Sequence, residues 1–373
     1  MRVAIVGNGT VSKAVQALLK PEELLYIYVR NKDKCVNEKC CFDYEKILAS
    51  DIDTVIEVIN NDEAYPFIIA ALKAHKHVIT ANKLTLALHM SEYLQLAKAN
   101  GVQLAFEASC GGSLPIIHEL QRMKRVDQIS ALGGILNGTS NFILDQMEQN
   151  GLEFSAALKR AQELGYAEAD PKSDISGLDS LRKLFILSQL ALDARLDSAA
   201  ISCEGIEQIT AGDIAFFKRK GQRLRLIAKM IARDGAYWAA VEPAVLSKDD
   251  PAANTFGCDN YFYLNSNSLK TLGFMGKGAG GLPTANAIIN DLRDIEEAAR
   301  PLPVLELQLP FDDAMIKERY VVRTQAKEDV MPYLDHCEGE YQYTIALGEA
   351  EKRALLKELR KKDGALFYAR VEG

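Results

Sequence analysis

The chain has 373 residues, of which 48% are hydrophobic and 25% are charged. These values are typical of a globular protein with about two or three domains, and they exclude a disordered or collagen-like chain. A net charge of −7 offers no basic surface for nucleic acid, whose phosphates are neutralised by Lys and Arg. No run of about 18 apolar residues is present to span a membrane.

The cysteines indicate the redox setting. Seven are present, an odd number, and no two of them form a CxxC pair. A disulfide framework or a zinc site would use cysteines at paired spacings, so free thiols are expected. We therefore expect a cytoplasmic protein.

The first predicted element is a strand at residues 2–6, an apolar run too short for the core of a signal peptide. A glycine turn and a helical pattern follow it directly. This order is the setting of a dinucleotide-binding fingerprint, in which glycines let the backbone approach a pyrophosphate and the helix N-terminus attracts its charge. An ordinary strand–helix turn is the alternative. The expected contacts are Gly7, Gly9, Thr10 and Val11.

The elements that follow alternate between strand and helix. Strands are predicted at 24–29, 53–59, 77–80 and 102–107, and helical patterns at 63–74 and 91–100 separate them. This alternation predicts an α/β domain with a Rossmann-type, doubly wound parallel sheet.

The residues after the second strand bear on the cofactor. NAD-binding proteins tend to place an acid there for the ribose, whereas NADP-binding proteins place a basic group for the 2′-phosphate. Here Arg30, Asn31 and Lys32 follow the strand, and an arginine can form a forked pair with a phosphate. We therefore expect NADP(H) to be preferred, with NAD(H) as the alternative and a solvated turn as the simpler interpretation.

Two further segments lie after strands. Asn82 and Lys83 follow the fourth strand, and ligands of doubly wound sheets bind outside the carboxyl ends of the strands. Glu107 precedes a glycine loop whose carbonyls could converge with it on a cation. In the same loop, Cys110 could instead attack an aldehyde as a thiolate, although no base for it is evident in the sequence.

The segment 164–184 concentrates four carboxylates and ends in a strongly helical stretch. On that stretch Asp179 and Lys183 are four residues apart, so they share a helix face. Acids that hold an ammonium group and a lysine that meets a developing alkoxide would suit a zwitterionic substrate. An exposed loop with a surface ion pair is the alternative.

Three ordered segments resemble the homoserine dehydrogenase family: 135–144, 164–184 and 276–285. With the glycine turn, the resemblance runs from there to about residue 300. It implies an NAD(P)H-dependent oxidoreductase that reduces L-aspartate 4-semialdehyde to L-homoserine, in threonine and methionine biosynthesis.

The resemblance also implies roles for individual residues. The catalytic residues would be Lys183, Lys83 and Asp179, with Lys183, helped by Lys83, stabilising and protonating the oxygen of the aldehyde. The residues that bind the substrate would be Glu168, Asp174, Tyr166 and Gly138.

Two binding sites in the dinucleotide domain follow from the same resemblance. Gly278 and Gly280 would form a second glycine loop beside the dinucleotide. A monovalent cation such as Na⁺ or K⁺ would be held by Glu107 with the backbone carbonyls of Cys110, Gly112 and Leu114.

This sequence departs from the family pattern at two positions. Ser12 stands where the family usually has the third glycine, which would weaken or reshape the pyrophosphate contacts. Cys110 stands where an aliphatic residue is common, but a backbone carbonyl ligand does not depend on the side chain.

The domains are expected as follows. A dinucleotide-binding domain would comprise 1–134 with 276–310, with a returning helix at 285–299, and an α+β substrate and dimerisation domain would comprise 135–275. The family pairs the sheets of the latter across an interface, so a homodimer or higher homo-oligomer is expected.

The tail at 315–373 has its own pattern. A strand, a helix at 327–336, a strand, a helix at 349–362 and a last strand are predicted. This order resembles a small ACT-like domain that is shortened by one strand, which leaves feedback by threonine open.

Two other functions remain open. One is a phosphorylating aldehyde dehydrogenase that uses Cys110, and the other is an NADP-binding sensor without catalysis. The concentration of acids with Lys183 in 164–184 argues against a sensor, which has no need for it.

Overall fold

The computed structural model describes residues 1–35 and 37–372, which form two compact units. The first unit comprises Met1–Gln128, Phe185–Arg195 and Gly276–Gln308. The second comprises Ile129–Leu184, Leu196–Met275 and Leu309–Gly373. The three-domain division expected from the sequence stays a prediction.

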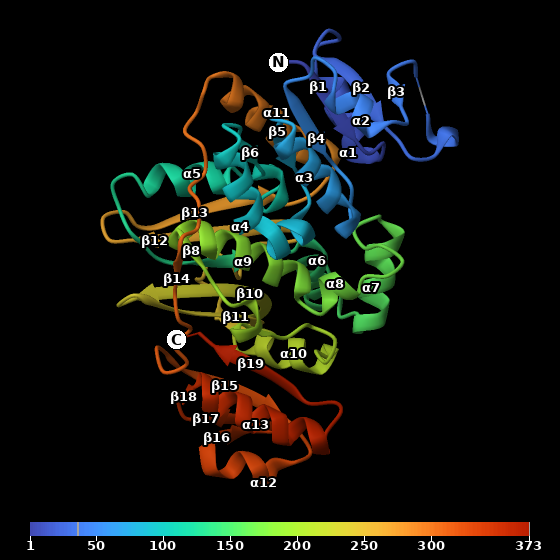
Figure 1. Cartoon of the computed structure of the whole chain (residues 1–373). Helices are drawn as coiled ribbons and strands as arrows, with labels where there is room; N and C mark the ends of the chain where they lie inside the picture. Colours follow the sequence, from blue (N-terminus) through green and yellow to red (C-terminus); the bar gives the residue numbers. More distant parts are fainter. Residues whose placement is uncertain (36, 373) are drawn as a thin grey trace. The chain divides into compact units, whose positions relative to one another are not determined.

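The first unit contains a six-stranded parallel sheet in the order β3-β2-β1-β4-β5-β6 (Figure 1). Its strands are β1 Val3–Val6, β2 Leu24–Tyr28, β3 Cys40–Cys41, β4 Thr54–Glu57, β5 His77–Thr80 and β6 Leu104–Ala105. The order reverses between β1 and β4, which is the arrangement of dinucleotide-binding folds. The Rossmann-type sheet predicted from the sequence is thus confirmed.

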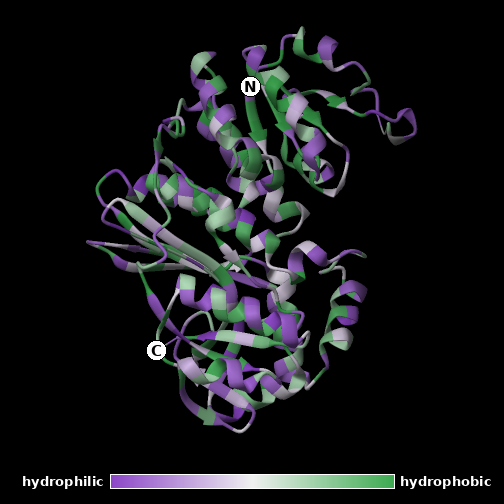
Figure 2. Cartoon of the chain, turned by 60° about the horizontal axis from the view of Figure 1, so that its bottom comes forward, coloured by the Kyte–Doolittle hydropathy of each residue, from purple (hydrophilic) through white to green (hydrophobic). Residues whose placement is uncertain are grey.

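The core of this unit joins segments distant in sequence. Its helices are α1 Thr10–Leu18, α2 Tyr44–Leu48, α3 Tyr65–Lys73, α4 Lys83–Ala99, α5 Ile116–Met123 and α11 Gly281–Glu296. The returning helix α11 packs on α1 and contributes Ile288 and Leu292 to the buried cluster around β1. All four residues of β1 are buried, and the strands near the N-terminus are coloured as hydrophobic in Figure 2. This explains their unbroken apolar sequence.

One helix begins earlier than its apolar pattern predicts. The pattern indicates a helix from residue 91, but α4 starts at Lys83 because the Asn82 side-chain oxygen accepts the backbone N–H of Leu84 (3.1 Å) and Thr85 (3.2 Å). An asparagine at this position satisfies N–H groups that have no partner within the helix. The cap therefore decides where α4 starts.

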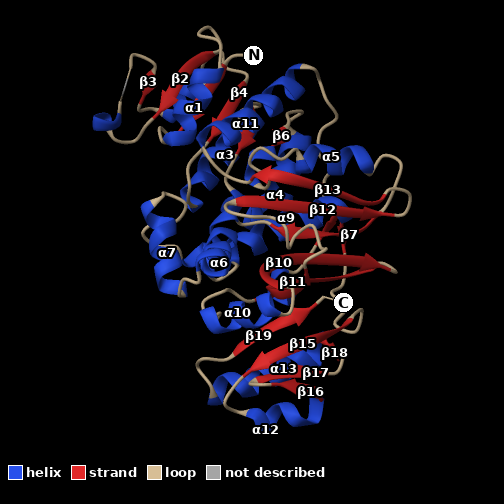
Figure 3. Ribbon diagram, turned by 180° about the vertical axis from the view of Figure 1, so that it is seen from behind, coloured by secondary structure: helices blue, strands red, loops and turns tan. Residues whose placement is uncertain are grey.

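The second unit contains an eleven-stranded mixed sheet, whose main path runs β13-β12-β7-β10-β11-β19-β15-β17-β16 (Figure 3). The strands are β7 Ile129–Ile135, β9 Ser202–Cys203, β10 Gln222–Arg233, β11 Ala236–Ser247, β12 Asp259–Ser266, β13 Lys270–Lys277, β15 Lys317–Arg323, β16 Leu334–Glu338, β17 Tyr341–Thr344, β18 Leu347–Gly348 and β19 Phe367–Val371. The long β10–β11 hairpin turns at Asp234 and Gly235, both with positive φ, as a two-residue turn between twisted strands requires.

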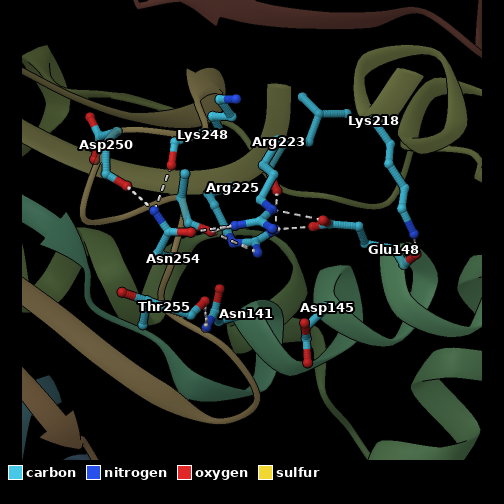
Figure 4. A network of polar contacts seen from close by, with 12 residues as sticks. Asn141, Asp145, Glu148, Lys218, Arg223, Arg225, Lys248, Asp250, Asn254 and Thr255 are labelled. Carbon is cyan, nitrogen blue, oxygen red and sulfur yellow. Dashed lines mark hydrogen bonds and ion pairs between the residues drawn. The ribbon is translucent and has the colours of Figure 1, made fainter. Parts of the chain in front are cut away.

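The helices of this unit are α6 Gly138–Asn150, α7 Phe154–Glu163, α8 Lys172–Ile175, α10 Ala211–Arg219, α12 Lys327–Val330, α13 Glu349–Lys362 and the first part of α9 Leu178–Leu192. A network of polar contacts holds α6 against β10 and the loop at 255–259 (Figure 4). Glu148 of α6 accepts bonds from Arg223 (2.8 Å) and Arg225 (3.0 Å) of β10. Asn141 donates to three backbone carbonyls between residues 255 and 259.

The tail differs from its sequence pattern in one element. The predicted helix at 327–336 ends as α12 at Val330, before Pro332, and β16 begins at Leu334 and pairs with β17. Met331 still has right-handed helical angles and Met331–Tyr333 form a 3₁₀ turn, but Pro332 has no N–H with which to continue the α-helical hydrogen bonds. The tail therefore contains strand β16, which the sequence pattern did not predict, and its strands and α-helices follow in the order β15, α12, β16, β17, β18, α13 and β19.

The tail also continues the sheet of the second unit. Strand β19 pairs in parallel with β11, where Ala244 is the partner of Arg370 and Val245 of Val371. No helix of the described residues has the length and apolar character needed to cross a membrane.

Candidate active site

The glycine turn of the first unit leaves room for a dinucleotide. Gly7 has a φ of +113°, and a Cβ there would lie 3.2 Å from the carbonyl oxygen of Val58. Gly9 is the N-cap of α1 without a side-chain cap, and nothing lies within 4 Å of a Cβ built on it. The N–H groups of Thr10 and Val11 lie in the first turn of α1, where backbone N–H groups have no partner within the helix.

Ser12 replaces the third glycine of the fingerprint without disrupting the turn. It is fully buried, and its hydroxyl accepts a bond from Gln16 Nε2 at 3.1 Å. The residue is thus small enough for α1 to lie close to β1, which is what the third glycine normally permits.

A second glycine segment lies beside the first. A Cβ on Gly281, at the start of α11, would lie 3.2 Å from Cγ2 of Thr10. A Cβ on Gly112 would lie 2.5 Å from the carbonyl carbon of Gly278. Gly280, with a φ of +122°, is the N-cap of α11. Three segments that are distant in sequence thus meet at this end of the first unit.

The residues after β2 are engaged with neighbours. The Arg30 guanidinium forms an ion pair with Glu63 at 3.0 Å and lies 5.7 Å from the centre of the Phe67 ring. Asn31 accepts the backbone N–H of Asp33, and Lys32 lies 5.7 Å from the centre of the Phe42 ring. The Arg30 side chain is 53% exposed, so it is accessible, but its charge is shared with Glu63.

Glu107 is bonded to the start of α5. Its two carboxylate oxygens accept the backbone N–H groups of Ile117 (2.9 Å) and His118 (2.8 Å), at the start of α5. His118 also faces Glu107 (3.1 Å), Asp291 (3.3 Å) and Asp294 (2.9 Å). Burial raises the pKa of Glu107 to about 7, and the bond to Asp291 raises that of His118 to about 9. Nothing in the sequence indicated that His118 faces these three carboxylates, because Asp291 and Asp294 are distant from it along the chain.

One backbone carbonyl of the expected cation site already accepts a hydrogen bond. The carbonyl of Leu114 accepts the N–H of Ile116 at 2.8 Å. No group of three or more His, Cys, Asp or Glu side chains suited to a metal occurs among residues 1–35 and 37–372. Cys110 is buried, and both ring nitrogens of His118 face carboxylates, so this histidine does not serve Cys110 as a base.

The second unit brings together the residues with the most specific chemistry. Lys183 Nζ lies 3.0 Å from Asp179 Oδ2 and donates to the carbonyl of Leu136 at 2.7 Å. Asn137 Nδ2 donates to Asp174 (2.7 Å) and to Asp179 (2.9 Å). Lys183 and Asp179 are only 6% and 3% exposed, which excludes a solvated surface pair. We call the side chains of Asn137, Asp174, Asp179 and Lys183 the buried acid–lysine cluster, in which Asp174 is half-buried and the other three are buried.

Local sequence explains how the buried acid–lysine cluster is built. Asn137 caps α6, since its side-chain oxygen accepts the N–H of Ser140 at 2.7 Å, and its amide is thereby aimed at the acids. Gly177, with a φ of +83°, precedes α9 and lies close to the carbonyl of Glu204. The sequence reasoning did not select Asn137, although an asparagine before a helix is a capping signal.

Two of the other expected substrate residues, Tyr166 and Gly138, lie near the start of α6. The carbonyl of Tyr166 accepts the hydroxyl of Thr139 at 2.6 Å, and Tyr166 is 44% exposed. Gly138 approaches a backbone, because a Cβ there would lie 2.5 Å from the carbonyl oxygen of Cys258. The side chain of Glu168 is exposed. Lys83 belongs to the first unit and Lys183 to the second, so their joint action stays a prediction.

Known proteins resemble this chain over most of its length. A family described as homoserine dehydrogenase matches residues 115–292, and one described as homoserine dehydrogenase, NAD binding domain, matches residues 5–107. A homoserine dehydrogenase of Bacillus subtilis is 40% identical over 251 residues, which cover 67% of this chain and 58% of that protein. One of Synechocystis is 37% identical over 306 residues, which cover 78% of this chain and 71% of that protein.

A solved structure extends the likeness to the tail. The crystal structure of a homoserine dehydrogenase from Thiobacillus denitrificans matches 100% of this chain and 98% of that chain, with a TM-score of 0.89 and 27% identity. The match to the Bacillus subtilis relative spans less than two thirds of that relative's length.

Proposed function

Since the chain belongs to the homoserine dehydrogenase family, we propose that it reduces L-aspartate 4-semialdehyde to L-homoserine with NAD(P)H. The observation that supports this most is the buried acid–lysine cluster, in a chain that also contains a dinucleotide-binding sheet. Acids for the substrate ammonium and a lysine for its reacting oxygen are the groups that this substrate needs.

The residues of the first unit fit a nicotinamide dinucleotide, which supplies the hydride when it is bound. The uncapped start of α1 and the space at Gly9 suit the pyrophosphate. We assign the 2′-phosphate of NADP(H) to Arg30, supported by Asn31 and Lys32. The exposure of Arg30 supports this preference, whereas its ion pair with Glu63 reduces the charge available.

Lys183 is the proposed acid. Two of the three hydrogens of its ammonium group point to Asp179 and to the carbonyl of Leu136. The third is the one that would be donated to the substrate oxygen as negative charge develops there. Asp179 orients the lysine, and the Asn137 amide holds the carboxylates of Asp179 and Asp174 in fixed positions next to each other. Lys83, at the carboxyl edge of the sheet of the first unit, is assigned to the same chemical step.

Na⁺ or K⁺ would be held by Glu107 with the backbone carbonyls of Cys110, Gly112 and Leu114. The N–H bonds from α5 to Glu107 orient its carboxylate, whose oxygens can each accept more than one contact. We further propose a homodimer, for which β13 offers a sheet edge, and an ACT-like tail at 315–373, which the placement of α12 and α13 among the strands β15–β19 supports.

A single assay tests the function. Purified protein is given aspartate semialdehyde with NADPH or with NADH, with and without threonine, and the absorbance of the reduced cofactor is followed. We expect turnover with either cofactor, faster at low concentration with NADPH. A Cys110→Ala variant should keep this activity, whereas loss of activity in it would favour a thiol mechanism. Absence of turnover in the wild type would refute the proposal.

A further inference from the structure

A fully buried carboxyl group lies at the carboxyl edge of the first unit's sheet, and the proposed chemistry does not use it. Glu57 is the last residue of β4 and has no exposed surface. No ion pair with a cation is found for it within residues 1–35 and 37–372. Burial raises the pKa of Glu57 to about 7, although bonds from Thr80 and Ile59 act in the opposite direction. Burying a carboxyl group without a neighbouring cation costs free energy. The hydrogen bonds that Glu57 makes therefore indicate which function it serves.

Glu57 is bonded to the end of the neighbouring strand. The hydroxyl of Thr80, the last residue of β5, donates to Glu57 Oε2 at 2.5 Å, and the backbone N–H of Ile59 donates to the other oxygen. The same hydroxyl oxygen accepts the backbone N–H of Asn82 at 3.0 Å. The carboxyl group therefore fixes the direction of a hydroxyl that in turn fixes the turn between β5 and α4.

Asn82 links the turn to the loop after β4 and to the start of α4. Its amide donates to the carbonyls of Ile59 (2.9 Å) and Asn61 (2.6 Å), and its oxygen caps α4. The residue that follows directly is Lys83, the first residue of α4. A cation is disfavoured at a helix N-terminus, so helix stability does not explain a lysine there.

We propose that Glu57 is a positioning residue that acts through Thr80 and Asn82 to hold Lys83 in its working place. The inference rests on the proposed function, because the position of Lys83 that matters is the one from which it would take part in the reduction. A purely structural role for Glu57 would instead affect folding alone.

The test compares variants of the hydroxyl that links the two residues. In Thr80→Val the hydroxyl is lost at nearly constant shape, and kcat should fall by roughly tenfold or more while KM for the cofactor changes by less than about threefold. Thr80→Ser retains the hydroxyl and should recover kcat to within about twofold of the wild type. The matched control is Thr54→Val, a buried threonine at the start of β4, which should leave kcat unchanged.

A double-mutant cycle separates positioning from packing. If Glu57 acts through Lys83, then Glu57→Gln lowers kcat in the wild type but has no further effect in a Lys83→Ala background. Equal effects of Glu57→Gln in both backgrounds would overturn the inference. So would a Thr80→Val variant with kcat within about twofold of the wild type.

Hydrogen exchange gives a readout that does not depend on turnover. Thr80→Val should speed exchange of the amides of Asn82, Leu84 and Thr85, and Thr80→Ser should restore their protection. Unchanged protection in Thr80→Val overturns the inference even if Glu57→Gln does not fold or the wild type does not turn over. An active wild type with unaffected variants refutes the positioning role alone, whereas an inactive wild type refutes the proposed function.

Discussion

Lys183 and Asp179 form an ion pair of 3.0 Å in which the two side chains are 8% and 5% exposed. Both residues lie one turn apart on α9, so the helix brings them together without help from the rest of the chain. Because the pair is buried, removing one partner should strongly destabilise the protein. The remaining charge would have neither solvent nor a counter-charge to stabilise it.

Replacing one member of this pair should therefore lower the free energy of unfolding more than replacing both. Asp179→Leu leaves the Lys183 cation alone and should cost about 3–5 kcal/mol of unfolding free energy. The double variant Asp179→Leu with Lys183→Met should regain much of that stability. Denaturant unfolding followed by circular dichroism measures both changes.

The same variants separate stability from catalysis. Lys183→Met should lower kcat by about 10² to 10⁴, as expected for loss of a general acid, and so should the stable double variant. A double variant that regained activity together with stability would show that Lys183 is structural only.

The ion pair between Arg30 and Glu63 should tune the choice of cofactor. Glu63→Gln frees the guanidinium and should lower KM for NADPH, whereas Arg30→Ala should raise it by roughly tenfold and leave KM for NADH unchanged. Initial rates with each cofactor measure this. Asp51→Asn, which breaks a comparable exposed pair with Arg2 in the same unit, is the control and should change neither KM. Equal effects on both cofactors would remove the 2′-phosphate from the role of Arg30.

The single tryptophan of the chain should report on the attachment of the tail. Trp238 of β11 is fully buried and donates to Glu349 of α13 at 3.0 Å. Burial would raise the pKa of Glu349, but the Lys352 ammonium and bonds from Ser202 and Arg353 hold it at about 2. The folded-state pKa is thus lower than the unfolded one, so the stabilisation of about 3 kcal/mol is present above pH 4.5 and is lost as pH falls toward 2.

Tryptophan fluorescence between about pH 7 and pH 2 should follow this loss. Emission should change only as the pH approaches about 2 in the wild type, where Glu349 takes up its proton in the folded protein, and the Glu349→Gln variant should lack that transition. Glu358→Gln, on the exposed part of the same helix, serves as the matched control and should titrate as the wild type does. An unaltered transition in Glu349→Gln would assign it to another group.

Glu148 should be the residue on which the placement of α6 depends most. It is bonded to Arg223 and to Arg225, and the Arg225 side chain is 0% exposed (Figure 4). Glu148→Ala leaves a buried guanidinium without its counter-charge and should cost about 3–5 kcal/mol in denaturant unfolding. Glu163→Ala breaks an exposed pair with Lys159 and should change stability by less than about 1 kcal/mol. Similar losses in the two variants would contradict the importance of burial.

The sequence by itself determined the parts that depend on neighbours along the chain. Unbroken apolar runs separated by helical patterns indicated the parallel sheet, since strands covered on both faces have no polar alternation. The glycine turn after β1 and the helix face shared by Asp179 and Lys183 are likewise local, because backbone geometry and helical spacing decide them. The resemblance to the family rested on three ordered motifs and supplied the activity.

Only the tertiary structure decided the contacts between distant segments. Asn137 meets Asp179, and Glu107 meets His118 and Asp291, through packing that no periodicity encodes. The start of α4 and the strand β16 were missed because one capping side chain, and one proline without an N–H, outweighed the apolar pattern around them. A side chain's partner across the fold depends on how elements pack, and packing is a property of the whole chain rather than of any window within it.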